Sequence, residues 1–91
     1  MSPDNTSGYG GLLPSSIALK VIGHSSDDFD LFVIGIVLRH VPDLNREAIG
    51  IRTSRDGNYM SVIVEIEPKT REQLDAVYKD LVSYERVIMV L

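Results

Sequence analysis

Two runs of alternating apolar and polar residues meet at Asp56-Gly57, and the stretch from Arg52 to Ile66 constrains the fold more than any other. A two-residue type I′ turn needs φ > 0 at both central positions, which Asp tolerates and Gly adopts freely. The stretch therefore predicts a β-hairpin closed by this turn. In the register that the turn sets, Arg55 lies opposite Asn58.

The same register divides the hairpin side chains between two faces, because successive side chains of a strand point to opposite sides. One face should belong to the core, and its residues are Ile49, Ile51, Thr53, Met60, Val62 and Val64. The other face is mixed, and its residues are Arg52, Ser54, Tyr59, Ser61, Ile63 and Glu65. From the hairpin alone, the mixed face can meet solvent, a partner chain or a ligand.

Length and composition indicate one soluble globular domain. The chain has 91 residues, of which 44% are hydrophobic and 24% charged. No apolar run approaches the roughly 20 residues that span a bilayer, and the start lacks the basic and apolar regions of a secretory signal. Cysteine is absent, which excludes disulfides, thiolate catalysis and Cys-ligated metals. We therefore expect a cytoplasmic protein with no membrane partner.

The acidic charge balance argues against a nucleic-acid partner. The formal net charge is −4 and the pI is near 4.9, whereas phosphate contacts need a basic patch. Gly57 and Tyr59 give a superficial likeness to the RNA-recognition motif, which fails in detail. Asp56 stands where that motif has a basic residue, and Ser61 stands where a second aromatic would stack a base.

The chain divides into an arm and a domain. Residues 1–14 are rich in Gly, Pro and small polar residues and bury too little to offset their ordering entropy, so we interpret them as a flexible arm. Residues 15–91 are interpreted as one domain. It opens with the alternation of a strand from Ser16 to Gly23.

A helix is predicted to follow this strand and to run to about His40, since Pro42 cannot continue it. Ser25 or Ser26 is its expected N-cap. One apolar stripe should pack on the sheet, formed by Phe29, Phe32, Val33, Ile36 and Val37. A second stripe, formed by Leu31, Ile34 and Leu38, lies roughly opposite. A monomer would therefore leave part of this helix apolar and exposed.

The last third of the chain predicts a second helix and a final strand. Thr70 to Gln73 has the pattern of a capping box, in which the Thr70 hydroxyl and the Gln73 amide satisfy two backbone N–H groups. The helix should bury Leu74, Val77, Tyr78 and Leu81. After Arg86 the chain is apolar on both faces to its end, which predicts a buried or interface strand.

The predicted order is β-α-β-β-α-β, the ferredoxin-like split βαβ arrangement. We predict an α+β sandwich with a four-stranded antiparallel sheet in the order 4-1-3-2 and both helices on one face. The other sheet face is then uncovered, and its expected residues are Ala18, Lys20, Ile22, Arg52, Ser54, Tyr59, Ser61 and Ile63.

Two histidines are the candidates for chemistry. His40 is expected at the C-terminal end of the first helix, where capping or packing is favoured over catalysis. His24 has Asp27, Asp28 and Asp30 nearby, a pattern better explained by helix capping than by a metal site. The sequence thus indicates no catalytic residue, no cofactor and no metal.

Several short motifs, spread over most of the chain, form a combination that is specific when taken together: Leu19 to Gly23, Arg39 to Pro42, Ser54, Gly57 to Tyr59, Ser61, Glu72 to Leu74, Tyr78, Val87 and Met89 to Leu91. With these motifs the sequence resembles the YbeD-like family of small bacterial proteins of unassigned function. The resemblance implies a ferredoxin-like domain similar to ACT-type regulatory domains, which often pair and bind small effectors at interfaces. Gly23 stands where amino-acid-binding ACT domains commonly have a Gly-containing loop. The chain departs from the family mainly in its glycine-rich arm.

We expect a non-enzymatic regulatory or interaction module that binds a small-molecule effector or a protein and forms a homo-oligomer, most simply a dimer. The binding surface is expected around Gly23, Arg52, Ser54 and Tyr59. The oligomer interface is expected at Leu31, Ile34 and Leu38 or at Ile22 and Ile63. Two alternatives stay open: a small-molecule enzyme that uses His40 with an acid and, less favoured, an RNA-binding domain.

Overall fold

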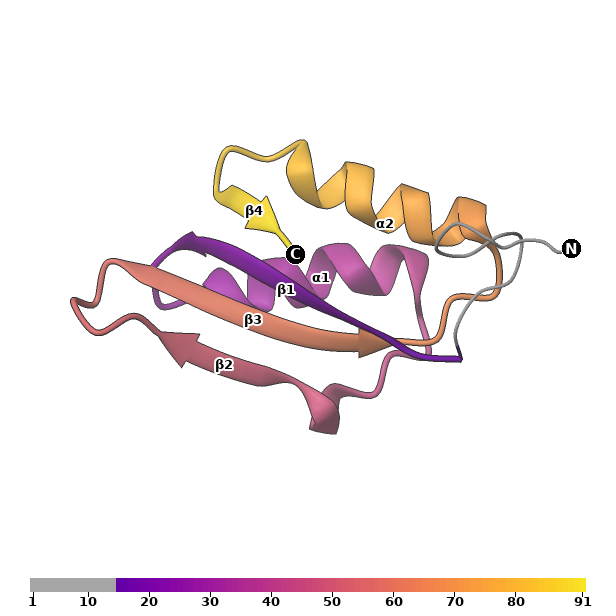
Figure 1. Ribbon diagram of the computed structural model, residues 1–91, viewed down its shortest axis with the longest axis horizontal. Coiled ribbons are helices and arrows are strands. Elements are labelled where there is room, and N and C mark those ends of the chain that lie inside the picture. Colours follow the sequence, from indigo (N-terminus) through magenta and orange to yellow (C-terminus); the bar gives the residue numbers. More distant parts are fainter. Residues whose placement is uncertain (1–14) are drawn as a thin grey trace, which may run out of the picture.

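A computed structural model describes residues 15–91, which form a four-stranded sheet with two helices on one face (Figure 1). The predicted arm at residues 1–14 lies outside the described residues. The elements are β1 (Ile17–His24), α1 (Phe29–His40), the short 3-10 helix η2 (Arg46–Ala48), β2 (Gly50–Thr53), β3 (Tyr59–Ile66), α2 (Arg71–Val82) and β4 (Val87–Val90). The strand order is β2-β3-β1-β4 with all neighbours antiparallel. This is the predicted order 4-1-3-2 read from the other edge, so the predicted fold class is confirmed.

The core lies between the two central strands and the helices. β1 and β3 pair along their whole length, from Ile17 opposite Ile66 onward, and their alternate side chains point toward the helices. The buried apolar side chains of the sheet are Leu19, Val21, Val62, Val64, Ile66, Val87 and Val90. The buried residues of the helices are Phe29, Val33, Ile36, Val37, Val77 and Leu81.

The two helices differ from their predicted faces in two places. The stripe of α1 that was predicted to pack on the sheet does so, but Ile34 and Leu38 are also partly buried against the core, which leaves Leu31 as the exposed member of the second stripe. On α2, Tyr78 is 47% exposed although its burial was predicted. α2 contacts α1 and β4 along the line of Val77 and Leu81, and Tyr78 lies about 100° round the helix from Val77. In residues 15–91, no helix is long and apolar enough to cross a membrane.

The register of the hairpin is confirmed, because Ile51 lies opposite Val62 and Thr53 opposite Met60. The prediction that Ile51 and Thr53 are core residues is wrong. All four residues of β2 are exposed, and Ile51 is 48% exposed. The helices pack over β1, β3 and β4, so β2 lies at an uncovered edge of the sheet.

The predicted type I′ turn at Asp56-Gly57 is wrong. Gly57 N donates to the Ser54 carbonyl (2.9 Å), which places Arg55 and Asp56 at the centre of the turn, and Gly57 follows with φ of 81°. Ser54 N donates to the Tyr59 carbonyl (2.8 Å) and so preserves the register. The result is a four-residue hairpin loop, a common alternative to the two-residue turn.

The caps of the helices are partly as predicted. Asp28, rather than Ser25 or Ser26, is the N-cap of α1, and its side chain makes no capping bond. At α2, the Thr70 hydroxyl accepts from Gln73 N (3.0 Å), which confirms the cap. The Gln73 amide oxygen accepts from Lys69 N (2.7 Å) instead of Thr70 N. The second bond of the predicted capping box is therefore made to the residue before the N-cap.

Candidate functional site

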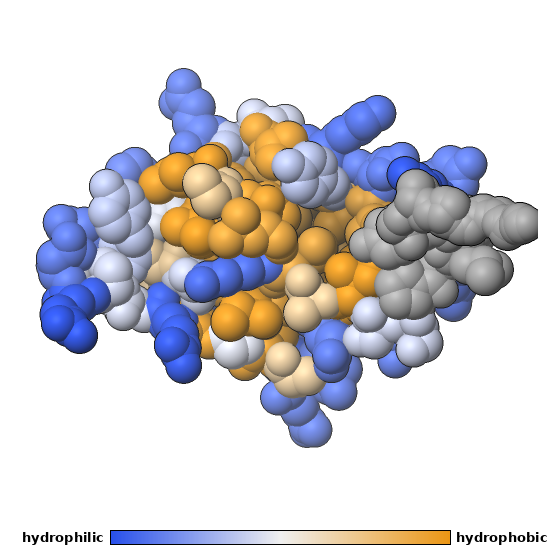
Figure 2. Space-filling model, viewed as in Figure 1, coloured by the Kyte–Doolittle hydropathy of each residue, from blue (hydrophilic) through white to orange (hydrophobic). Residues whose placement is uncertain are grey.

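The sheet face opposite the helices, here called the open face, is left uncovered by the elements of residues 15–91. β1 and β3 pass in front of α1 in Figure 1, and Figure 2 shows apolar side chains gathered across the middle of the same view. Met89 of β4 lies opposite Ile22, and Leu91 pairs with Lys20 through two backbone hydrogen bonds of 3.1 and 2.9 Å. Met89 is 46% exposed and Leu91 62% exposed. With Ile63 of β3, these side chains form the apolar centre of the open face: Ile22, Ile63, Met89 and Leu91.

Polar and aromatic residues surround this centre. Lys20 lies opposite Ile63, and Arg52 lies opposite Ser61. At one end, Tyr59 faces His24 with ring centroids 5.6 Å apart. The alternation that was predicted for the hairpin thus places Arg52 and Tyr59 on the open face, where both are exposed.

Gly23 does not contribute to the open face. It is buried at the end of β1, and a Cβ at this position would overlap the carbonyl oxygen of Arg86 and the ring of Phe29. The residue therefore permits close packing of α1 and β4 against β1. The structure gives Gly23 no exposed surface for the predicted binding role.

Ser54 is committed to the hairpin loop. Its hydroxyl donates to Asp56 Oδ1 (2.7 Å) and accepts from Tyr59 N (3.0 Å). Asp56 Oδ1 also accepts from Asn58 N (3.0 Å). These bonds, that of Ser54 first, lower the pKa of Asp56 below its ordinary value. Ser54 thus orders the loop that holds Tyr59 at the end of the open face.

The predicted interface residues fall into two separate places. Ile22 and Ile63 are half-buried on the open face. The stripe of Leu31, Ile34 and Leu38 belongs to α1, on the other side of the sheet. The structure therefore does not join them into one surface.

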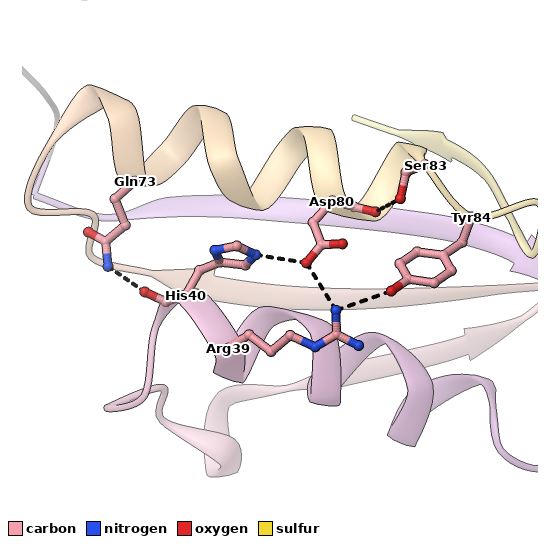
Figure 3. A network of polar contacts seen from close by, with 6 residues as sticks. All are labelled: Arg39, His40, Gln73, Asp80, Ser83 and Tyr84. Atoms are coloured by element: carbon pink, nitrogen blue, oxygen red, sulfur yellow. Dashed lines mark hydrogen bonds and ion pairs between the residues drawn. The ribbon is translucent and has the colours of Figure 1, made fainter.

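His40 belongs to a polar cluster between the two helices (Figure 3). His40 Nε2 lies 2.8 Å from Asp80 Oδ2, and the Arg39 guanidinium lies 3.3 Å from the same oxygen. Arg39 also donates to the Tyr84 hydroxyl (3.1 Å), which is the main cause that raises the pKa of Arg39. Gln73 Nε2 donates to the His40 carbonyl (2.7 Å). The cluster ties the C-terminal end of α1 to α2.

The chemistry open to this cluster is restricted by its contacts. The side chains of His40 and Asp80 are only 25% and 20% exposed. A general base needs a ring nitrogen within reach of a substrate proton; with Nε2 on Asp80 that nitrogen would be Nδ1, and His40 does not line the hollow found beyond the end of α1. The arrangement therefore fits a contact between helices better than a catalytic pair.

A second polar cluster joins the start of α1 to the approach to β4, and the sequence did not reveal it. Arg86 binds Asp28 through both carboxylate oxygens, at 2.7 and 3.3 Å, and donates to the Ser26 hydroxyl (2.8 Å). Its guanidinium lies 4.5 Å from the ring centroid of Phe32. Arg86 lowers the pKa of Asp28, and Asp28 raises that of Arg86. The predicted strand order could have indicated this cluster. Pairing β4 with β1 brings Val87 opposite Gly23, and so places Arg86 near Asp28 at the start of α1.

A hollow of about 120 Å³ lies beyond the end of α1. Its lining consists of Val41, Asp43, Leu44, Asn45, Ala48, Glu65, Ile66 and Glu67. Neither His40 nor Asp80 lines it. In the described part of the chain, no three His, Cys, Asp or Glu side chains are placed to hold a metal ion together.

Comparison with known sequences gives consistent matches. The model of a family described as "Protein of unknown function (DUF493)" matches residues 13–91. A UPF0250 protein of Ectopseudomonas mendocina is 44% identical over 73 residues, which cover 80% of this chain and 79% of that protein. A UPF0250 protein of Neisseria gonorrhoeae is 37% identical over 78 residues, which cover 86% of each chain.

Two solution structures share the fold. The ACT domain from GTP pyrophosphokinase of Chlorobium tepidum matches with a TM-score of 0.63 and 16% identity, over 86% of both chains. Protein HP0495 from H. pylori matches with a TM-score of 0.67 and 13% identity, over 100% of this chain and 96% of that one. At these identities the likeness shows the ACT-like fold alone.

Proposed function

The chain belongs to the DUF493 family of UPF0250, or YbeD-like, proteins, and we propose that it is a non-enzymatic interaction module of the cytoplasm that binds a partner protein through its open face. The observation that carries the proposal is the apolar centre of that face, where, among residues 15–91, Met89 and Leu91 are exposed and Ile22 and Ile63 are half-buried. Exposed apolar patches rimmed by polar residues mark interaction sites in soluble domains. Arg52 and Tyr59 are the rim residues that direct the partner.

The regulatory part of the proposal is supported by the fold. One structural neighbour is the ACT domain of a GTP pyrophosphokinase, a domain that belongs to an enzyme. ACT-type domains often act as regulatory modules, and we propose that this chain likewise alters the activity of the protein it binds. The small-molecule effector expected from the resemblance would act on the same assembly.

The non-enzymatic part is supported by the contacts of His40. Its ring nitrogen, its carbonyl and its neighbour Arg39 all bond to α2 or to Tyr84 just beyond it. These bonds give His40 a role in packing α1 against α2. We therefore expect His40→Ala to lower stability without removing partner binding.

The test is photo-crosslinking from defined positions in living cells. A photoreactive amino acid at Met89 on the open face is compared with one at Asp75, which is exposed on α2. We expect Met89 to give discrete protein adducts that Asp75 does not give and that Ile63→Asp removes. Adducts that are the same from both positions, or that survive Ile63→Asp, would contradict an interaction at the open face.

A further inference from the structure

The dimensions of the open face limit what can cover it. Strands lie about 4.8 Å apart and rise about 3.3 Å per residue, and both edge strands, β2 and β4, have four residues. The part of the face that all four strands share is therefore roughly 19 Å wide and 13 Å long, on the order of 250 Å². A stable protein–protein interface covers about 800 Å² on each partner. This shared part of the face is by itself too small to hold two copies of the chain together firmly.

One amphipathic helix fits this area. A helix with its side chains is about 10–12 Å wide, and three turns are about 16 Å long. Helices of this kind dock in apolar grooves through residues at i, i+3, i+4 and i+7. The apolar centre of the face offers four side chains for such a contact: Ile22, Ile63, Met89 and Leu91.

The charges of the open face are opposite in sign to the chain as a whole. Lys20 and Arg52 are its two full cations, and Glu65, opposite Ala18, is its carboxylate, while the chain carries a net charge of −4. Among residues 15–91, the side chains of Lys20 and Arg52 form no ion pair. Two cations, neither of them in an ion pair within residues 15–91, therefore flank an apolar surface that carries one carboxylate, Glu65.

A second copy of the chain would bring the same two cations to the face, and like charges brought together oppose association. Nucleic acid would supply negative charge, but its bases stack on aromatic rings. The centre of this face is aliphatic and thioether. A partner with acidic residues beside apolar anchors satisfies both the charge and the apolar centre.

We propose that the occupant of the open face is an acidic amphipathic helical segment of the partner protein. The inference rests on the proposed function and adds the size and the charge of the partner. The apolar residues of the segment cover Ile63 and Met89, while its carboxylates pair with Lys20 and Arg52. Tyr59 and His24 bound the segment at one end.

The test uses a library of 16-residue peptides displayed on phage and selected against the full chain. The best peptide is then titrated by fluorescence anisotropy. We expect selected peptides to carry Asp or Glu beside Leu, Ile or Phe at helical spacing. The double variant Lys20→Glu/Arg52→Glu should weaken binding about tenfold or more, and exchanging the peptide acids for Lys should restore it. Higher salt should weaken the wild-type complex.

Lys79→Glu is the matched control, because Lys79 is exposed on α2, away from the open face. It should leave binding unchanged. Neutral or basic selected peptides, or binding indifferent to Lys20→Glu/Arg52→Glu, would overturn the acidic partner, and so would tighter binding of single-stranded RNA or of a second copy. If those peptides still lose binding with Ile63→Asp, the proposed function stands. If no selected peptide responds to Ile63→Asp, both proposals fail.

Discussion

His40 Nε2 lies 2.8 Å from Asp80 Oδ2, and through this contact the C-terminal end of α1 is fixed to α2. The two residues are 40 positions apart in the sequence. Both side chains are mostly buried. Removing Asp80 takes away the partner of His40 Nε2, whereas removing His40 leaves Asp80 with Arg39 alone, and the loss is about 1–3 kcal/mol. A loss of stability of this size is what a structural role of His40 predicts, whereas a purely catalytic role predicts none.

His40→Ala and Asp80→Ala should each destabilise the fold, and the double variant should lose less than the sum. We expect a coupling energy of about 0.5–3 kcal/mol from urea unfolding. Lys79→Ala, next to Asp80 but exposed, is the control and should change stability little. Strictly additive losses would show that the contact does not stabilise the helix pair.

Gly23→Ala should destabilise the chain by about 1–3 kcal/mol, the usual cost of overpacking. The added methyl group would overlap the Arg86 carbonyl and the Phe29 ring. Gly35→Ala is the matched control, because a Cβ there meets nothing within 4 Å and Ala favours a helix by about 0.5–1 kcal/mol. Thermal unfolding that ranks the two variants in the opposite order would contradict the packing role of Gly23.

Gly57→Ala should destabilise the hairpin by about 1–2 kcal/mol. The φ of Gly57 is 81°, and space is open around it, so the cost is conformational and not steric. Gly50→Ala in β2 is the control, because a Cβ there makes only ordinary contact with Ile63. Urea unfolding of both variants measures the difference, and an equal effect at the two positions would refute the loop geometry.

Asp28 should make stability depend on pH. Arg86 first, and then Ser26, lowers its pKa from the ordinary value of 3.8, so the folded chain takes up this proton less readily than the unfolded chain. The stabilisation is present above pH 3.8 and is lost as the pH falls through the lowered pKa. Arg86→Met should therefore flatten the stability profile in this acidic range, measured by urea unfolding at stepped pH. An unchanged profile would mean that Arg86 does not set the pKa of Asp28.

Self-association through the open face should be weak. At about 25 cal/mol per Å², covering a patch of this size yields several kcal/mol, most of which is offset by the entropy of association. Sedimentation equilibrium should show a dimer only at high micromolar concentration, and Ile63→Asp should abolish it. Leu31→Asp tests the helix stripe, of which Leu31 is 68% exposed. A dimer that persists with Ile63→Asp but is lost with Leu31→Asp would show that the interface lies on α1 instead of the open face.

The sequence by itself determined which residues share a face. The register expected from the Asp56-Gly57 turn placed Ile51 opposite Val62. Strand alternation assigned Arg52 and Tyr59 to the face away from the helices. The helical spacing of α1 identified Phe29, Val33, Ile36 and Val37 as buried. These are relations between near neighbours along the chain, and the geometry of a strand or a helix fixes them.

The tertiary structure alone decided which of those faces are covered and which distant side chains meet. Ile51 is exposed because the helices do not extend over β2. Ile34 and Leu38 are partly buried because they pack against the core. Asp28 meets Arg86 across 58 positions. Burial and ion pairing depend on where whole elements pack, which periodicity along the chain does not encode.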